Sequence, residues 1–319
     1  MQSKVIHLRP SETESIADHI DDFIAALERM PKDFSKNTLK AYRSDLALAG
    51  AALTQPLDTI TAGDIERFLT SGGVTPSTAQ RRAASLNRFF RWAVRERICG
   101  HNPVDLIEST TTTRRLPRPI RSATERERLD TAIAQAPQPH RLIFTILRET
   151  GMRVSEVLAL ELGDVQLGVG QEGLHVREAK NNHERIVILG ANATPKTLRQ
   201  LRALLKKRAR EPLYTPLIRN KRGGRMGYTT VVYQWKKICA RAKLVDETGD
   251  PRYTIHQLRH TRGTELFEDG IGVEHVQRIL GHRDIRSTLG YAELDDAQTR
   301  QQLERAGKPR SRRPESDTR

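Results

Sequence analysis

The chain has 319 residues, 37% of them hydrophobic, which suits two domains with ordinary cores. It has no run of about 20 apolar residues, no apolar N-terminal leader and only two cysteines, Cys99 and Cys239, so we expect a cytoplasmic protein with no membrane partner and no disulfide framework. Lys and Arg total 54 against 39 Asp and Glu, and this formal charge of +15 draws a protein to polyanions.

The first region, residues 11–108, is expected to be a helical domain. Residues 37–54 carry apolar side chains at helical spacing, and residues 58–70 predict a short second helix. Residues 76–98 predict the clearest helix of the region. Its apolar stripe consists of Leu86, Phe89, Phe90 and Ala93.

Basic side chains occupy the other faces of these predicted helices. Residues 76–98 contain six arginines and a single acid, Glu96. A solvated helix face usually mixes both signs of charge, so phosphate contact is favoured over simple solvation. The DNA contacts expected from this domain are Lys40, Arg43, Arg81, Arg88 and Arg91.

Residues 109–121 are expected to be a basic linker. Four consecutive threonines lack a helical pattern, and Pro117 and Pro119 stiffen the chain. Arg114 and Arg115 are candidates for contact along a nucleic-acid backbone, although a solvated tether would have the same composition. Ser122 and Glu125, just beyond the linker, predict a capping box that opens a new helix.

The second region, residues 122–294, is expected to mix helices with a little sheet. Residues 142–147 indicate a buried helix, and residues 173–189 alternate like two strands around a turn at residues 180–183. Further helices are predicted at residues 229–242, 254–269 and 273–280, the last ending at Gly281. Residues 295–319 indicate a C-terminal helix followed by a disordered basic tail.

Four separated motifs in this second region carry groups suited to breaking a phosphodiester without a metal. The reaction needs a nucleophile, fixed donors for the charge on the non-bridging oxygens, and a proton for the leaving oxygen. Arg153 and Arg259 can grip both sides of one phosphate through their planar forks, and His282 can add a donor. Such preorganised donors are worth roughly 3–4 kcal/mol each in a transition state.

The remaining needs also have candidates. Lys180, at the end of the first predicted strand, is the natural acid for the leaving oxygen. His256 lies three residues before Arg259, so the two share a helix face, and His256 can accept the proton of the nucleophile. Tyr291 is the candidate nucleophile, and because the pKa of free tyrosine is near 10 it needs both a base and a cationic surround.

The order and spacing of these groups closely resemble the tyrosine recombinases, the phage integrase and Xer-like family. The family signature is an Arg followed three residues later by Glu, a β-hairpin Lys, an H-x-L-R-H box, an L-G-H box and a final T-x-x-Y. The matching positions here are Arg153 with Glu156, Lys180, His256 to His260, Leu280 to His282, and Thr288 to Tyr291. His183, where the hairpin often has a second Lys, and Gly290 are mild departures.

The resemblance implies roles for these residues. Arg153, Arg259 and His282 would hold the scissile phosphate. Lys180 would protonate the leaving 5′ oxygen, and His256 would assist proton transfer. Tyr291 would form a 3′-phosphotyrosyl bond, and because that link conserves the bond energy, neither ATP nor a metal or other cofactor is expected.

The resemblance also implies an architecture and an assembly. The fold would be mainly α with a small β-sheet, a helical SAM-like core-binding domain and a mixed α/β catalytic domain forming a C-shaped clamp around double-stranded DNA. The working unit would be a tetramer on two recombination sites, which exchanges strands through a Holliday junction. Whether all four protomers are copies of this chain, and which DNA site they use, stays open at the level of sequence.

Three other interpretations compete with this one. A zinc hydrolase would use His256, His260 and His282 as ligands, but Gln257 stands where its catalytic Glu would be. A non-enzymatic DNA-binding regulator would explain the basic helices but not Tyr291 with Lys180. A type IB topoisomerase would share the chemistry and differ in acting as a monomer; the small size and two-domain layout favour the recombinase.

Overall fold

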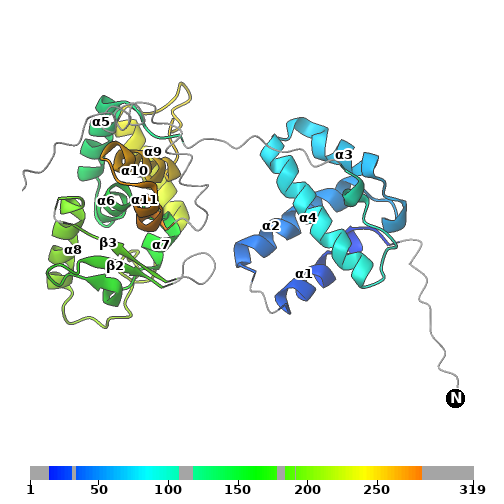
Figure 1. Cartoon of the computed structure of the whole chain (residues 1–319), viewed down its shortest axis with the longest axis horizontal. Helices are drawn as coiled ribbons and strands as arrows, with labels where there is room; N and C mark the ends of the chain where they lie inside the picture. The colour runs from blue at the N-terminus through cyan, green and yellow to red at the C-terminus, as the bar shows by residue number, and fades with distance from the viewer. Residues whose placement is uncertain (1–13, 31–33, 108–117, 178–183, 191, 282–319) are drawn as a thin grey trace, which may run out of the picture. The chain divides into compact units, whose positions relative to one another are not determined.

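The computed structural model describes residues 14–30, 34–107, 118–177, 184–190 and 192–281. The chain divides into two compact units, Met1–Arg114 and Arg115–Arg319 (Figure 1). Within the described ranges, no helix combines the length and the apolar character that a membrane crossing requires.

In its described residues, the first unit contains four α-helices and several short 3-10 turns. The helices are α1 (Ile20–Glu28), α2 (Lys36–Ala52), α3 (Ala62–Thr70) and α4 (Pro76–Arg95). The turns are Ala17–His19, Leu57–Thr59, Ser71–Gly73 and Pro103–Leu106.

An aromatic cluster forms the centre of this unit. Phe23 of α1 meets Phe89 of α4 edge to face at 5.5 Å between ring centroids, and Trp92 packs on both rings. Such pairs add to the stabilisation that burial already supplies. The predicted stripe of α4 is confirmed, because Leu86, Phe89, Phe90 and Ala93 are all buried.

The helix predicted at residues 58–70 is shorter than expected. A 3-10 turn occupies Leu57–Thr59, and α3 begins only at Ala62. The reason is a capping box: the Thr61 hydroxyl accepts from the backbone N–H of Asp64, and the Asp64 carboxylate accepts from the N–H of Thr61. This reciprocal pair satisfies N–H groups that would otherwise lack partners at the helix start.

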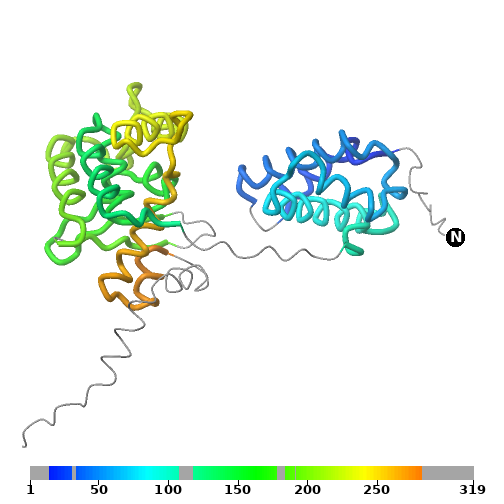
Figure 2. The backbone as a smooth tube through the Cα atoms, turned by 90° about the horizontal axis from the view of Figure 1, so that it is seen from above, coloured from blue at the N-terminus to red at the C-terminus, as the bar shows by residue number. Residues whose placement is uncertain are grey.

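The second unit packs helices against one another and against a small sheet. Its elements are α5 (Ala123–Ala134), α6 (His140–Thr150), α7 (Val154–Ala159), a 3-10 turn (Leu162–Asp164), β1 (Val165–Gln166), β2 (Gly173–Val176), β3 (Arg185–Ile188), α8 (Pro195–Lys207), α9 (Tyr228–Arg241), α10 (His256–Glu268) and α11 (Val273–Leu280). Figure 2 follows this path, with α11 in orange beside α10.

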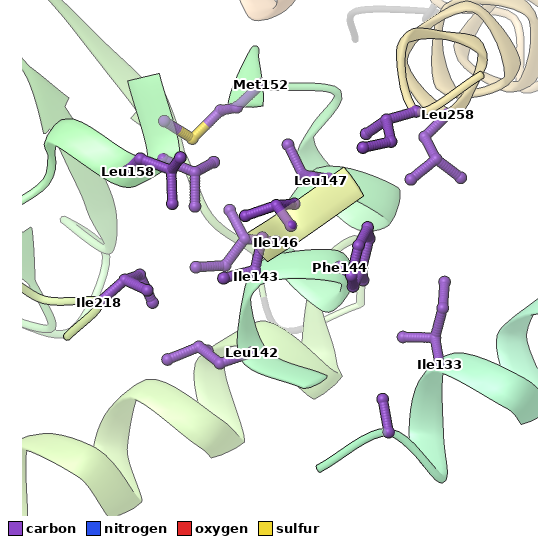
Figure 3. Packing of buried hydrophobic residues seen from close by; sticks show 14 of the residues in the cluster. Ile133, Leu142, Ile143, Phe144, Ile146, Leu147, Met152, Leu158, Ile218 and Leu258 are labelled. Atoms are coloured by element: carbon purple, nitrogen blue, oxygen red, sulfur yellow. The ribbon is translucent and has the colours of Figure 1, made fainter. Parts of the chain in front are cut away.

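Helix α6 is the centre of the second unit. Ile143, Phe144, Ile146 and Leu147 are buried on several sides of it, and α5, α7, α8 and α10 pack around it (Figure 3). All six consecutive residues from Leu142 to Leu147 are buried, so this stretch of the helix lies in the core. The prediction of a buried helix at residues 142–147 is confirmed.

The sheet is antiparallel, in the order β1-β2-β3. Gly173 pairs with Ile188 and Val176 with Arg185, so the predicted hairpin is confirmed. The short strand β1 and helix α8 were not predicted from the sequence.

The capping box expected at Ser122 forms only by half. The Ser122 hydroxyl accepts from the backbone N–H of Glu125, which starts α5 as predicted. The Glu125 carboxylate, however, accepts from the Tyr253 hydroxyl at 2.7 Å and pairs with Arg252. A tertiary partner has therefore replaced the local backbone N–H.

Candidate active site

Arg153 lies in a tight turn between α6 and α7. Gly151 ends α6 in the left-handed conformation, with φ +69°, and Arg153 is the N-cap residue of α7. The carboxylate of Glu156 accepts from the Arg153 backbone N–H at 2.9 Å and from its Nη1 at 2.8 Å. The Arg-x-x-Glu spacing is thus a helix start, and it holds the guanidinium of Arg153 against a fixed anion.

Arg259 of α10 connects two turns that are far apart in the sequence. Its side chain is buried, with the residue 2% exposed. Nη1 donates to the carbonyl of Gly151 at 2.8 Å, and Nη2 donates to the carbonyl of Leu280 at 2.6 Å. One carbonyl lies two residues before Arg153 and the other two residues before His282, so Arg259 brings three of the predicted motifs together.

The contact between these turns is too close for larger side chains. A Cβ on Gly151 would lie 2.6 Å from Cδ2 of Leu280, and Gly281 ends α11 with φ +68°. Glycine is the residue that tolerates both this conformation and this approach. The expected helix end at Gly281 is confirmed.

Two histidines lie on the same helix. His256 is the first residue of α10, and its ring meets that of His260 edge to face at 4.8 Å. Burial, together with the neighbouring charges of Arg259 and Arg153, lowers the pKa of His256 below 6.5. Burial and the neighbouring His256 lower the pKa of His260 to about 4. Both rings are therefore neutral at pH 7, the form in which a histidine can accept a proton.

Arg185, the first residue of β3, joins the same cluster and was missed by the sequence analysis. Its Nη1 and Nη2 donate to the two oxygens of Glu156, each at 2.9 Å. The sequence does contain a signal for Arg185. It lies two residues before Val187 on the predicted strand, so the two side chains face the same side of the sheet, and Val187 is buried. An arginine in register with a buried residue points toward the same side of the sheet.

Glu156 is consequently surrounded by cations. Burial raises its pKa, but the bonds and charge of Arg185 and the bonds from Arg153 outweigh burial and lower the pKa from 4.5 to about 2. The carboxylate therefore stays ionised at any pH at which the protein would be handled.

Three of the predicted catalytic residues, Lys180, His282 and Tyr291, lie outside the described residues. The candidate linker contacts Arg114 and Arg115 lie outside them as well. In the part of the chain that is described, no group of three His, Cys, Asp or Glu side chains could hold a metal ion. A cavity of about 730 Å³ opens beside α6 and α8, but it is lined by none of the predicted catalytic residues.

The predicted DNA contacts of the first unit differ in their surroundings. Lys40 and Arg91 are exposed. Arg43 is also exposed, and it pairs with Asp21. Arg81 pairs with the buried carboxylate of Asp45 and is half exposed.

Arg88 is less exposed than the other predicted contacts of this unit. Its guanidinium lies 5.3 Å from the ring centroid of Phe34, and its Nη2 donates to the sulfur of Met30. The side chain is partly buried, so it also contributes to packing in the first unit.

Two known domain families match most of the chain. Residues 122–298 match the phage integrase family, and residues 20–97 match the phage integrase N-terminal SAM-like domain. Tyrosine recombinase XerD of Listeria innocua is 32% identical over 87% of this chain and 94% of its own length. Tyrosine recombinase XerD of Ralstonia nicotianae is 29% identical over 91% and 93%.

Solved structures share the fold. A lambda integrase dimer bound to a COC′ core site superposes with a TM-score of 0.68 at 22% identity, covering 87% of this chain and 95% of that one. XerH recombinase bound to a palindromic difH substrate gives a TM-score of 0.66 at 22% identity, covering 85% and 80%. With both domain families matched in order and curated relatives aligned along nearly their whole length, the chain belongs to the phage integrase family of tyrosine recombinases.

Proposed function

We propose that this chain is a site-specific DNA recombinase that cuts and rejoins DNA through a 3′-phosphotyrosyl intermediate on Tyr291. The observation that carries the proposal is the position of Arg259, whose guanidinium binds the turn before Arg153 and the turn before His282. Groups from three separate motifs thereby meet at one place, as the handling of a single phosphate requires.

The reaction divides into two balanced transesterifications. In the first, the Tyr291 oxygen attacks phosphorus, its proton passes to His256, and the bond from phosphorus to the 5′ oxygen breaks as Lys180 protonates that oxygen. Arg153, Arg259 and His282 stabilise the charge on the non-bridging oxygens. In the second, a 5′ hydroxyl of the partner strand attacks phosphorus and gives its proton to Lys180, and the bond from phosphorus to the Tyr291 oxygen breaks as His256 returns its proton to that oxygen.

The chemistry of the described groups supports this assignment. The lowered pKa of His256 keeps its ring neutral and able to accept a proton. The fixed carboxylate of Glu156 orients the guanidinium of Arg153. Arg153 is more exposed than Arg259, the other arginine proposed to hold the phosphate. No step requires ATP, because the phosphotyrosyl link retains the energy of the broken bond.

We further propose that the two units hold duplex DNA as a C-shaped clamp and that four protomers act on two sites through a Holliday junction. A lambda integrase tetramer bound to a Holliday junction has been solved, and this chain shares its fold, with a TM-score of 0.67 at 22% identity. Four copies of this chain, or pairs of this chain with a second recombinase, both satisfy this proposal.

The direct test is the variant Tyr291→Phe on a nicked suicide substrate that traps the cleaved strand. Wild-type protein is expected to form a covalent protein–DNA adduct on a denaturing gel, and Tyr291→Phe none, since the substitution removes only the attacking oxygen. Tyr214→Phe is the matched control, because Tyr214 is a 75% exposed tyrosine in the same unit. An adduct with Tyr291→Phe as strong as with wild type would remove Tyr291 from the mechanism.

The same assay separates the rival functions. A zinc hydrolase built on His256 and His260 would lose cleavage in excess EDTA and leave no covalent adduct. A DNA-binding regulator would bind without cleaving. The recombinase is expected to form its adduct at an unchanged rate in EDTA, since arginines supply the positive charge that a metal would.

A further inference from the structure

Arg185 connects three parts of the second unit that are distant in the sequence. It begins strand β3, and its guanidinium forms two parallel hydrogen bonds with the carboxylate of Glu156 in α7. Its Nη2 also approaches the carbonyl of Leu280 at the end of α11, at 3.4 Å. The side chain is only 15% exposed, so these bonds are largely shielded from water.

The end of α11 is shaped around this side chain. A Cβ placed on Gly281 would lie 2.6 Å from Cζ of Arg185. The carbonyl of Leu280 accepts from both Arg185 and Arg259. The hairpin strand β3 and the turn at Gly281 are therefore in direct contact, as the neighbouring positions of β3 and α11 indicate (Figure 1).

Glu156 lies between two arginines with different surroundings. Its Oε1 accepts from Nη1 of Arg153 at 2.8 Å and from Nη1 of Arg185 at 2.9 Å. Arg153 is one-third exposed, whereas Arg185 is largely covered. The covered arginine neutralises and orients the carboxylate, and the carboxylate in turn orients the more exposed arginine.

We propose that Arg185 is a positioning residue for strand cleavage, which acts through Glu156 on Arg153 and through Leu280 on the turn that precedes His282. The inference rests on the proposed function and adds to it a residue that does not touch the phosphate. Arg185 links strand β3, which follows Lys180 in the chain, to Glu156 beside Arg153 and to the carbonyl of Leu280, so these elements are prearranged before DNA binds.

An arginine is required because of its shape. The planar guanidinium offers a rigid fork to both carboxylate oxygens and still carries a further N–H toward a carbonyl. A lysine at the same position keeps the charge but donates from one point. Comparing Arg185→Lys with Arg185→Gln therefore separates the effect of the charge on cleavage from the effect of the guanidinium geometry.

The experiment measures single-turnover cleavage of the suicide substrate at saturating DNA, and separately the Kd for a single half-site. Arg185→Gln is expected to slow cleavage about 100-fold, the scale of a small misplacement of catalytic groups, with little change in Kd. Arg185→Lys is expected to fall between Arg185→Gln and wild type. The control is Arg202→Gln, which removes an arginine from an exposed ion pair with Glu172 in the same unit and should cleave at the wild-type rate.

A double-variant cycle tests whether Arg185 acts through Glu156. If it does, Arg185→Gln combined with Glu156→Gln should cleave no more slowly than the slower single variant, because both remove the same link. Losses that simply multiply would overturn the coupling. Circular dichroism melts of each variant confirm that cleavage is measured on folded protein, and a general loss of structure would reduce half-site binding as well.

The outcomes distinguish this inference from the proposed function. If wild-type protein forms no adduct, the recombinase assignment fails and the role of Arg185 fails with it. If wild type cleaves and Arg185→Gln cleaves equally fast, only the positioning role is overturned. Slow cleavage with unchanged half-site binding, partly restored in Arg185→Lys, supports it.

Discussion

At the scale of single residues, His256 illustrates how burial sets chemistry. A solvated histidine is partly protonated at neutral pH, whereas burial and two neighbouring arginines lower the pKa of His256. The groups facing it are Arg153 from the α7 turn, and Arg259 and His260 from its own helix. The two arginine charges and burial disfavour the protonated ring, so His256 keeps its capacity as a base at a lower pH than a solvated histidine does.

We predict that cleavage falls in acid as His256 becomes protonated, and that the midpoint of this fall lies at a lower pH than the pKa of free histidine. The sign follows from the lowered pKa, because the neutral form persists to lower pH than in free histidine. The variant His256→Ala should cleave at least about 100-fold more slowly than wild type. Its rate should also lose the fall in acid that protonation of His256 causes. Single-turnover rates from about pH 5 to 8 check both points; a fall in the wild-type rate with its midpoint above the pKa of free histidine would contradict the assignment.

Arg259 shows a different effect at the same scale. Its two carbonyl bonds and 2% exposure make it a structural link, in addition to the phosphate-binding role that we propose for it. A buried guanidinium left without its acceptors is costly, so the two turns and the arginine stabilise one another. The spacing of H-x-L-R-H in the sequence contains no sign of this arrangement.

At the scale of elements, α4 combines a buried aromatic stripe with exposed arginines. The apolar residues pack toward Phe23, and Arg91 is exposed on the other side of the helix. Arg81 is tied to the buried Asp45, which also accepts from Ser85 at 2.8 Å. The arginines predicted to contact phosphate therefore differ in how freely they can do so, and Arg91 is the cleanest candidate.

We predict that Arg91→Ala lowers the slope of log affinity against log salt by about 0.9, the loss of one phosphate contact. Fluorescence anisotropy with a half-site duplex from about 50 to 300 mM salt measures the slope. Arg29→Ala, an exposed arginine at the end of α1 that we do not expect to contact DNA, is the control. An unchanged slope in Arg91→Ala would mean that this face of α4 is merely solvated.

Arg88→Ala should behave differently from Arg91→Ala. It removes a cation from the ring of Phe34 and a donor to Met30, so it should lower the melting temperature as well as affinity. Comparing the two variants separates a phosphate contact from a packing contribution on one helix.

At the scale of the whole molecule, the division between Arg114 and Arg115 falls within the basic linker expected at residues 109–121. Each unit has its own hydrophobic core, one around Phe89 and one around Phe144. Separate cores are the physical basis for treating the units as domains.

The segment after Tyr291, residues 294–306, lies outside the described residues and has helix signals in its sequence: Asp295 and Asp296 suit a start, and Gly307 suits a stop. So short and weakly apolar a helix needs a docking surface, either on its own protomer or on a neighbour. We favour the neighbour, because coupling between protomers would serve a tetramer.

We predict that a chain ending at Leu294 binds a single half-site almost as tightly as wild type but loses cooperative binding of the second protomer and most recombination. A chain ending at Gly307, which removes only the basic tail, is the control and should remain cooperative. Gel-shift titrations on half and full sites measure both quantities. Full cooperativity in the shorter chain would show that this segment packs on its own protomer or nowhere.

The amino-acid sequence by itself determined the family, the helical stripes and the hairpin. These features depend on residues close in the chain or on motifs whose order is diagnostic: the stripe of α4, the alternation around residues 180–183 and the glycine that ends α11 could all be recognised locally. The start of α3 was misplaced because a capping box at Thr61 decided it, and α8 was missed.

Only the tertiary structure decided which of these groups meet. Arg185 and Glu156 are 29 residues apart, and Arg259 and Gly151 are 108 apart. Glu125 exchanged its expected local partner for Tyr253 across the unit. The physical reason is that a buried charge takes whichever partner the packed chain brings to it, and that partner is set by the arrangement of helices rather than by neighbouring residues.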